Sequence, residues 1–164
     1  MRKVMLGMLA WWGVVAVQAQ PACSIDLLPA LDKINALRAQ GAMCGNRRMA
    51  NAGPVRAHPA LDASARSFAQ DLATQDRLSH LNTAGQALRA RLRESGYAMR
   101  TAAENVAGGA ETLDEVLEQW MASPLHCENL MAPEFQEFGL ACATGSGALE
   151  RFWVLQLAQP ARAP

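Results

Sequence analysis

An apolar segment at the amino terminus decides which part of this chain can fold as a domain. Arg2 and Lys3 precede fourteen residues, 4–17, that carry no charged or strongly polar side chain. The sequence Val17-Gln18-Ala19 then places small residues at the −3 and −1 positions of a cleavage site. This order is typical of a secretory signal peptide cleaved after Ala19. The alternative is a membrane anchor, which needs about 20 apolar residues to span a bilayer, so the segment is too short.

Export would leave one domain of ordinary size. We expect residues 1–19 to direct the chain to the periplasm or out of the cell, and residues 20–164 to fold as a single domain. The chain has 15 basic and 15 acidic residues, and loss of Arg2 and Lys3 leaves 13 basic and 15 acidic. Because nucleic-acid-binding proteins usually carry a basic excess, we expect no nucleic-acid partner. No second apolar run of 18 residues follows, so we expect a monomer without a stable membrane anchor after cleavage.

All four cysteines lie in the part that would be exported, Cys23, Cys44, Cys127 and Cys142. An even number of cysteines in an exported chain predicts disulfide bonds. Three pairings are possible, and short loops close most easily, so proximity favours Cys23–Cys44 and Cys127–Cys142. The alternative, a cysteine zinc site, lacks the usual C-x-x-C or H-x-x-x-H spacing.

Helical patterns come early in the chain and strand patterns come late. Apolar residues at helical spacing, together with start and stop residues, predict the helices. Alternating apolar residues on either side of a Gly-Ser-Gly turn predict a hairpin near the carboxyl end. The expected elements are helices at 24–40, 60–77, 86–95 and 112–123, a long loop at 41–59, an extended or irregular segment at 97–106, and strands at 135–144 and 151–158. This order favours an α+β sandwich with antiparallel strands.

The region around the third expected helix is rich in arginine. Arg89, Arg91, Arg93 and Arg100 are expected to form a solvated basic face. Contact with an anionic surface is the alternative interpretation of the same residues.

Two histidines and one acid are the candidates for chemistry. His80 follows the second expected helix, and His126 lies in a polar turn after the fourth. Between them, Glu104 and Asn105 occupy an apolar stretch that ends in two glycines. A buried carboxylate needs a partner, and a histidine is a natural one. Spacing alone does not bring these residues together, so purely structural polar residues are an open alternative.

An ordered set of short motifs resembles the CAP superfamily, which comprises cysteine-rich secretory proteins, antigen 5 and plant pathogenesis-related proteins. The similarity is greater to the bacterial secreted branch, whose modules are called SCP-like. The matching pieces are Leu78-Ser79-His80, Arg91-Leu92, Gly96-Tyr97, Glu104-Asn105-Val106-Ala107 with Gly109, Trp120-Met121-Ala122-Ser123-Pro124 with His126, Asn129 and Leu130, Phe138-Gly139-Leu140-Ala141, and Phe152-Trp153. Their order and spacing extend over most of the exported part, and the resemblance sets the expected core at about 31–160.

The resemblance implies an α-β-α sandwich around a small antiparallel sheet, with His80, Glu104 and His126 lining one cleft. The ligand-binding set that it implies is Ser79, His80, Glu104, Asn105, His126 and Asn129. The family pattern includes a second acid, at the position where this chain has Ser123. Glu115 or Glu118 would have to substitute for it, and the sequence itself does not show such a substitution.

Three functions are compatible with this pattern. The first is a binding module: His80 and His126 would hold a weakly bound divalent ion, Zn or Mg, with Glu104 orienting one ring, or the domain would take a small hydrophobic or sterol-like ligand. The second is a hydrolase using His80, Glu104 and His126, but the nearby serines, Ser79 and Ser123, do not lie in a G-x-S-x-G sequence. The third is a disulfide-stapled structural domain. The sequence favours a binding role over an enzyme and requires no cofactor.

Overall fold

The computed structural model describes Cys23 and residues 25–161, and the expected signal peptide lies outside this part. The helices are α1 Leu27–Gln40, α2 Pro59–Gln75, α3 Leu88–Glu94, α4 Leu113–Ala122 and α5 Pro124–Met131. The strands are β1 Ala42–Cys44, β2 Arg47–Met49, β3 Arg56–Ala57, β4 Met99–Gly108, β5 Glu137–Thr144 and β6 Arg151–Pro160. No helix in the described part is long and apolar enough to cross a membrane.

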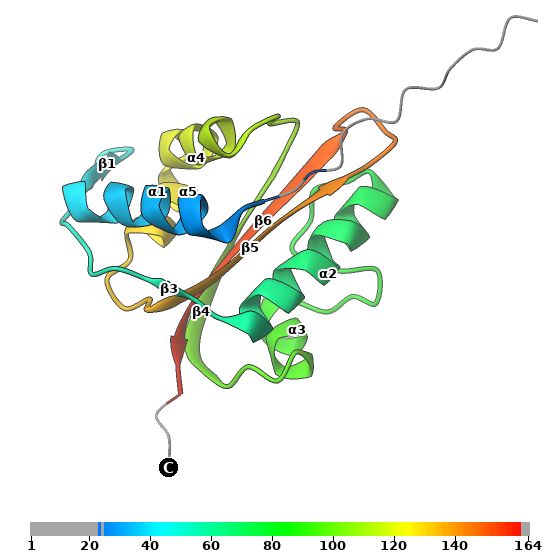
Figure 1. Ribbon diagram of the computed structural model, residues 1–164, viewed down its shortest axis with the longest axis horizontal. Coiled ribbons are helices and arrows are strands. Elements are labelled where there is room, and N and C mark those ends of the chain that lie inside the picture. Colours follow the sequence, from blue (N-terminus) through cyan, green and yellow to red (C-terminus); the bar gives the residue numbers. More distant parts are fainter. Residues whose placement is uncertain (1–22, 24, 162–164) are drawn as a thin grey trace, which may run out of the picture.

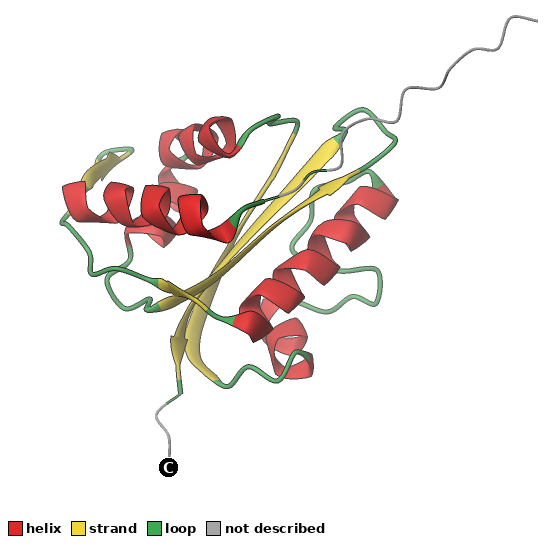
Figure 2. Ribbon diagram, viewed as in Figure 1, coloured by secondary structure: helices red, strands yellow, loops and turns green. Residues whose placement is uncertain are grey.

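A four-stranded sheet with the order β3-β5-β6-β4 forms the middle layer. Strands β5 and β6 form the expected antiparallel hairpin, β4 pairs antiparallel with β6, and the short β3 runs parallel to β5. Helices α2 and α3 cover one face, and α1, α4 and α5 lie on the other (Figures 1 and 2). The α-β-α sandwich expected from the resemblance is therefore confirmed.

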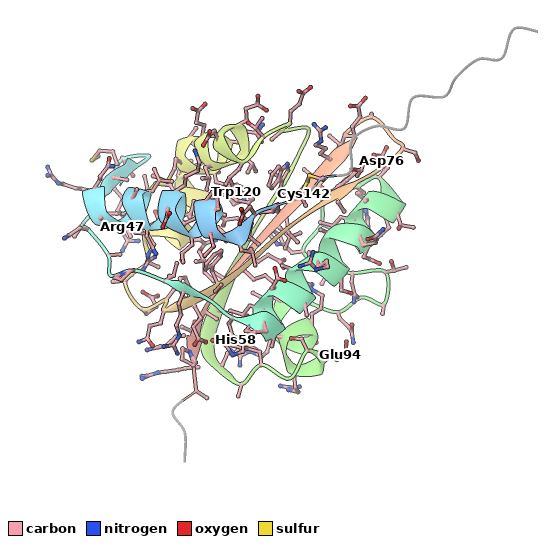
Figure 3. All side chains as sticks on the ribbon, in the orientation of Figure 1. Arg47, His58, Asp76, Glu94, Trp120 and Cys142 are labelled. Atoms are coloured by element: carbon pink, nitrogen blue, oxygen red, sulfur yellow. A yellow bond between two sulfur atoms is a disulfide. The ribbon has the colours of Figure 1, made fainter. Side chains whose placement is uncertain are left out.

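Apolar side chains fill both interlayer spaces. Trp120 of α4 and Phe138 of β5 are buried between the sheet and the α1, α4 and α5 layer, and Figure 3 marks Trp120 in that layer. Phe68 and Leu72 of α2 pack on the opposite face. Gly139 lets α2 approach the sheet, because a Cβ there would lie 2.2 Å from the backbone carbon of Leu61.

The disulfide pairing that we expected is wrong. The bonds join Cys23 to Cys142 and Cys44 to Cys127. Cys23 and Cys44 flank the 14-residue helix α1, which is about 21 Å long, whereas bridged Cα atoms lie within about 7 Å. Proximity in sequence was a weak guide, because doubling a loop costs only about 0.6 kcal/mol of closure free energy. The fold brings the amino-terminal segment to β5 and the β1–β2 hairpin to α5.

Two further expectations need correction. Segment 41–59 is not only loop, because it contains the antiparallel β1–β2 hairpin and β3. The polar turn expected around His126 is helix α5, with Pro124 at its first position. Proline fits the first turn of a helix because that turn leaves its N–H groups unpaired.

Arg38 of α1 is a buried cation that organises the loops beside this layer. Its guanidinium group donates to four backbone carbonyls, those of Gly53, Leu130, Ala132 and Phe135. Burial lowers the pKa of Arg38, and the nearby Glu134 acts in the opposite direction. The residue fastens the end of α5 and the chain leading to β5, which sets the position of α5 over the sheet.

Candidate functional site

Strand β4 lies at the edge of the sheet and carries two adjacent polar residues at its centre. Glu104 is 7% exposed and Asn105 is completely buried. Because successive side chains of a strand point to opposite faces, these two serve different layers. Glu104 contacts residues on the α2 and α3 side, and Asn105 contacts α5.

The carboxylate of Glu104 has three side-chain partners. Arg91 of α3 donates from Nη2 to Oε2, and Gln156 donates from Nε2 to the same oxygen at 3.0 Å. Gln156 lies directly opposite Glu104 in the β4–β6 register. His80 approaches Oε1 through Nδ1 at 3.1 Å. Neither Arg91 nor Gln156 was expected from the sequence as a partner of the acid.

Arg91 is buried, so the fully solvated basic face that we expected is wrong at this position. Its side chain stacks 3.5 Å from the centroid of the Phe68 ring, and its Nη1 donates to the backbone carbonyls of His80 and Gln86. Arg89, Arg93 and Arg100 are exposed as expected. The spacing of Leu88, Arg91, Leu92 and Ser95 follows one helix face, and this pattern could have identified the buried arginine.

His80 contacts Glu104 through one of its two ring nitrogens. A carboxylate only accepts hydrogen bonds, so Nδ1 carries the proton that faces Glu104, and in the neutral ring Nε2 is the nitrogen with the free lone pair. The side chain is 59% exposed. The hydrogen bond to Glu104 raises the pKa of His80, although burial and the charge of Arg91 oppose this effect.

His126 lies on the other side of β4 in a different environment. Burial lowers the pKa of His126, and the charge of His80 lowers it further, so the two imidazoles share one neighbourhood. Asn105 donates to the His126 carbonyl at 3.0 Å and accepts from the Asn129 amide at 2.9 Å. The next residue, Cys127, is bonded to Cys44. Helix α5 is thus held to β4 by the Asn105 hydrogen bonds and to the β1–β2 hairpin by the disulfide.

The remaining candidates do not extend this cluster. The Ser79 hydroxyl accepts from the backbone N–H of Leu81, and Ser123 is the residue before α5. The Glu115 carboxylate caps α4, so it does not replace the second family acid. Glu118 lines a separate groove between α1 and α4. In the described part of the chain, no three His, Cys, Asp or Glu residues form a metal-ligating group.

The groove between α1 and α4 was not anticipated from the sequence. It has a volume of about 320 Å³ and a largely apolar lining that includes Leu37, Leu117 and Met121. Lys33 and Asp114 also line it and form an ion pair at 2.5 Å. An apolar groove with a few polar groups is typical of a small-ligand site.

Comparisons with known proteins agree on the type of fold. The model of the CAP, cysteine-rich secretory protein family matches residues 31–157. The uncharacterized protein YkwD of Bacillus subtilis is 30% identical over 87 residues, which are 53% of this chain and 34% of that protein. The chain thus spans about a third of the length of this curated relative.

Solved structures with similar folds come from several bacteria. An extracellular protein with an SCP domain from Bacillus anthracis is 19% identical, with a TM-score of 0.66 over 80% of this chain and 39% of that one. An outer surface protein of Borrelia burgdorferi is 18% identical, with a TM-score of 0.66 over 85% and 99% of the two chains. A cysteine-rich secretory protein of Staphylococcus aureus is 15% identical, with a TM-score of 0.55 over 80% and 38%. At these identities the likeness shows the fold alone.

Proposed function

Because the chain belongs to the cysteine-rich secretory protein (CAP) family, we propose that it is an exported binding domain whose two histidines hold an exchangeable divalent metal ion. We also propose that the protein is exported, either to the periplasm or out of the cell. The solved relatives described as extracellular or outer-surface proteins support export, as does the signal-peptide pattern of residues 1–19.

One observation carries the metal proposal: Glu104 fixes the ring of His80. A histidine that ligates a metal commonly donates its other ring N–H to a carboxylate, which sets the tautomer and the direction of the lone pair. Here the Nδ1–Glu104 contact does so, and Arg91 and Gln156 hold the carboxylate still. His80 Nε2 and the neutral ring of His126 would then supply the ligands.

The affinity of such a site is modest. Two imidazoles leave most positions of a Zn or Mg ion to water, whereas structural zinc sites have four protein ligands. The chemistry that a bound ion would supply is Lewis acidity. Glu104 already has three side-chain partners, and the Ser79 hydroxyl is engaged in its own loop, so the geometry favours binding over a nucleophilic hydrolase.

Calorimetric titration of the oxidised protein with zinc and magnesium tests the proposal. We expect saturable binding by the parent protein, no binding by the His80→Asn, His126→Asn double variant, and affinity about 10–100-fold lower for Glu104→Gln. His58→Asn is the matched control, because His58 caps α2 by accepting from the Ala60 N–H and asparagine is also a good cap. No binding by the parent, or equal binding by the double variant, would eliminate the metal site.

The structural alternative predicts a different result. If His80, Glu104 and His126 only hold the fold together, the double variant loses stability and the parent binds neither ion. Urea unfolding of the same proteins without metal therefore accompanies the titration.

A second candidate ligand is favoured by the groove between α1 and α4. Its apolar lining and its volume of about 320 Å³ suit a small hydrophobic ligand, whose polar end would meet the Lys33–Asp114 ion pair in the lining. Displacement of a fluorescent fatty acid tests this, with Ala36→Phe to fill the groove and Ala39→Phe on the same helix outside its lining as the control. Equal displacement by both variants would reject the groove.

A further inference from the structure

We propose that the surface formed by the loop after α2 and by α3 docks onto an anionic phospholipid bilayer. We call residues 77–93 the loop–α3 surface. It lies on the α2 and α3 side of the sheet, between Asp76 and Glu94, which Figure 3 labels. This inference is independent of metal binding by the histidines.

Two exposed leucines lie close together in the loop of this surface. The large apolar side chains exposed in the described part of the chain are Leu28, Met43, Leu78, Leu81 and Leu125. Leu78 and Leu81, at 43% and 48% exposure, lie three positions apart in one short loop. Leucines grouped in this way are suited to insertion between lipid headgroups.

The cations at this surface lack acidic partners. Elsewhere Lys33, Arg47, Arg56 and Arg66 each form an ion pair with a carboxylate. The ion pairs of the described residues include none with the exposed arginines of the loop–α3 surface, which are Arg77, Arg89 and Arg93.

The arrangement of two of these arginines favours an external anion. Arg89 and Arg93 are four residues apart on α3, so they share one helix face and repel each other. Residues 77–94 contain three exposed arginines, Arg77, Arg89 and Arg93, and a single acid, Glu94. Phosphate groups outside the protein would therefore stabilise this helix face.

The loop that carries the leucines is held in place. Buried Arg91 donates to the carbonyls of His80 and Gln86, and Asp71 of α2 accepts from the Thr83 backbone N–H. A loop already ordered in the protein loses little conformational entropy when it binds.

An anionic bilayer can bind both the exposed arginines and the exposed leucines of this surface. Its anionic headgroups lie directly above acyl chains, so the arginines would pair with phosphates while the loop leucines reach the apolar boundary. A soluble anion would engage only the arginines, and an apolar small molecule would engage only the leucines. Charge complementarity therefore selects the anionic bilayer as the occupant.

Flotation of the oxidised protein with vesicles tests the docking. Vesicles of phosphatidylglycerol and phosphatidylcholine are compared with phosphatidylcholine alone, at low and at 0.5 M salt, a concentration at which the Debye length falls to about 4 Å. We expect binding to the anionic vesicles that salt abolishes. Arg89→Gln with Arg93→Gln should weaken it about 25-fold, since each arginine near such a surface contributes a factor of about five. Leu78→Ser with Leu81→Ser should weaken it at least about tenfold.

The control carries the same kinds of change at distant positions. Leu28→Ser with Arg48→Gln removes an exposed leucine and an exposed arginine from α1 and the β1–β2 hairpin, and should bind like the parent. Thermal unfolding checks that every variant is folded. Equal flotation with neutral vesicles, no flotation at all, or loss of binding in the control to the same extent would overturn the proposal.

Discussion

The two faces of β4 hold their histidines by different means. On the Glu104 side, His80 is mostly exposed and depends on a buried ion pair between Glu104 and Arg91. On the Asn105 side, His126 is half-buried and belongs to a helix fixed by a disulfide and by neutral hydrogen bonds. The imidazole of His80 is therefore oriented by a contact with a charged group, whereas the position of the His126 imidazole is set by the backbone of its helix.

This difference separates the proton affinities of two nearby imidazoles. The pKa of His80 is raised by its contact with Glu104, and the pKa of His126 is lowered by burial and by His80. Groups whose environments push their pKa values apart can take different roles in one site. His80 therefore keeps its proton to a higher pH than His126, so a metal ion would compete with that proton for the His80 ring more than for the His126 ring.

The largest expected effect comes from breaking the ion pair on the Glu104 side. Arg91→Met leaves a buried carboxylate without its cation, which should lower the free energy of unfolding by about 3–5 kcal/mol. Urea unfolding measures the change, and the exposed Arg89→Met on the same helix should remain within about 0.5 kcal/mol of the parent. Adding Glu104→Gln to Arg91→Met should recover part of the loss. Equal effects of Arg91→Met and Arg89→Met would show that the pair is not needed.

The second effect comes from cutting the disulfide on the Asn105 side. Replacement of Cys44 and Cys127 by alanine should cost about 2–5 kcal/mol and should weaken metal binding, because α5 loses its covalent attachment beside His126. Replacement of Cys23 and Cys142 should have a similar cost in unfolding but leave metal affinity unchanged. Urea unfolding and calorimetry separate the two. A loss of metal affinity only in the Cys23 and Cys142 variant would contradict this assignment.

A smaller loss is expected when the neutral hydrogen bonds on the same side are removed. Asn105→Ala leaves the Asn129 amide and the His126 carbonyl without their partner, which should cost about 1–3 kcal/mol. The exposed Asn46→Ala provides the control for loss of an amide. A stability change of the same size in both variants would mean that Asn105 does not hold α5.

The secondary structure could be predicted from the sequence where the pattern of apolar residues is long and local. The expected strands 135–144 and 151–158 correspond to β5 and β6 within a few residues, because alternation and a glycine turn define a hairpin. Helix α5 was missed because it has only eight residues and begins at Pro124, which also suits a change of direction. The disulfides were mispaired because their geometry is set by the packing of layers, which local sequence does not report.

The candidate site could be predicted only in part, because its contacts also depend on how distant segments pack. His80, Glu104 and His126 came from an ordered resemblance, and the contact between His80 and Glu104 agrees with it. Gln156 carried a usable pattern, since it interrupts the apolar run from Phe152 to Ala158 of a central strand. Which acid it would meet depends on the register of β4 against β6, two strands joined by a long stretch of chain.

The smallest effect is also the most direct measure of the difference between the faces. In metal-free protein, an NMR titration of the imidazole protons should give His80 a pKa above its usual value and His126 a pKa below it. Glu104→Gln should lower the pKa of His80, and His80→Asn should raise that of His126 by removing a like charge.

The raised pKa of His80 adds stability below the unfolded-state pKa of about 6.5, and this contribution is lost as pH rises through the folded-state pKa. The pKa of His126 shifts in the opposite direction, so its contribution to stability is lost as pH falls below about 6.5 towards its folded-state pKa. Because the His80 side chain is mostly exposed, its part should stay below about 1 kcal/mol. Identical pKa values for the two rings would show that β4 does not divide their environments.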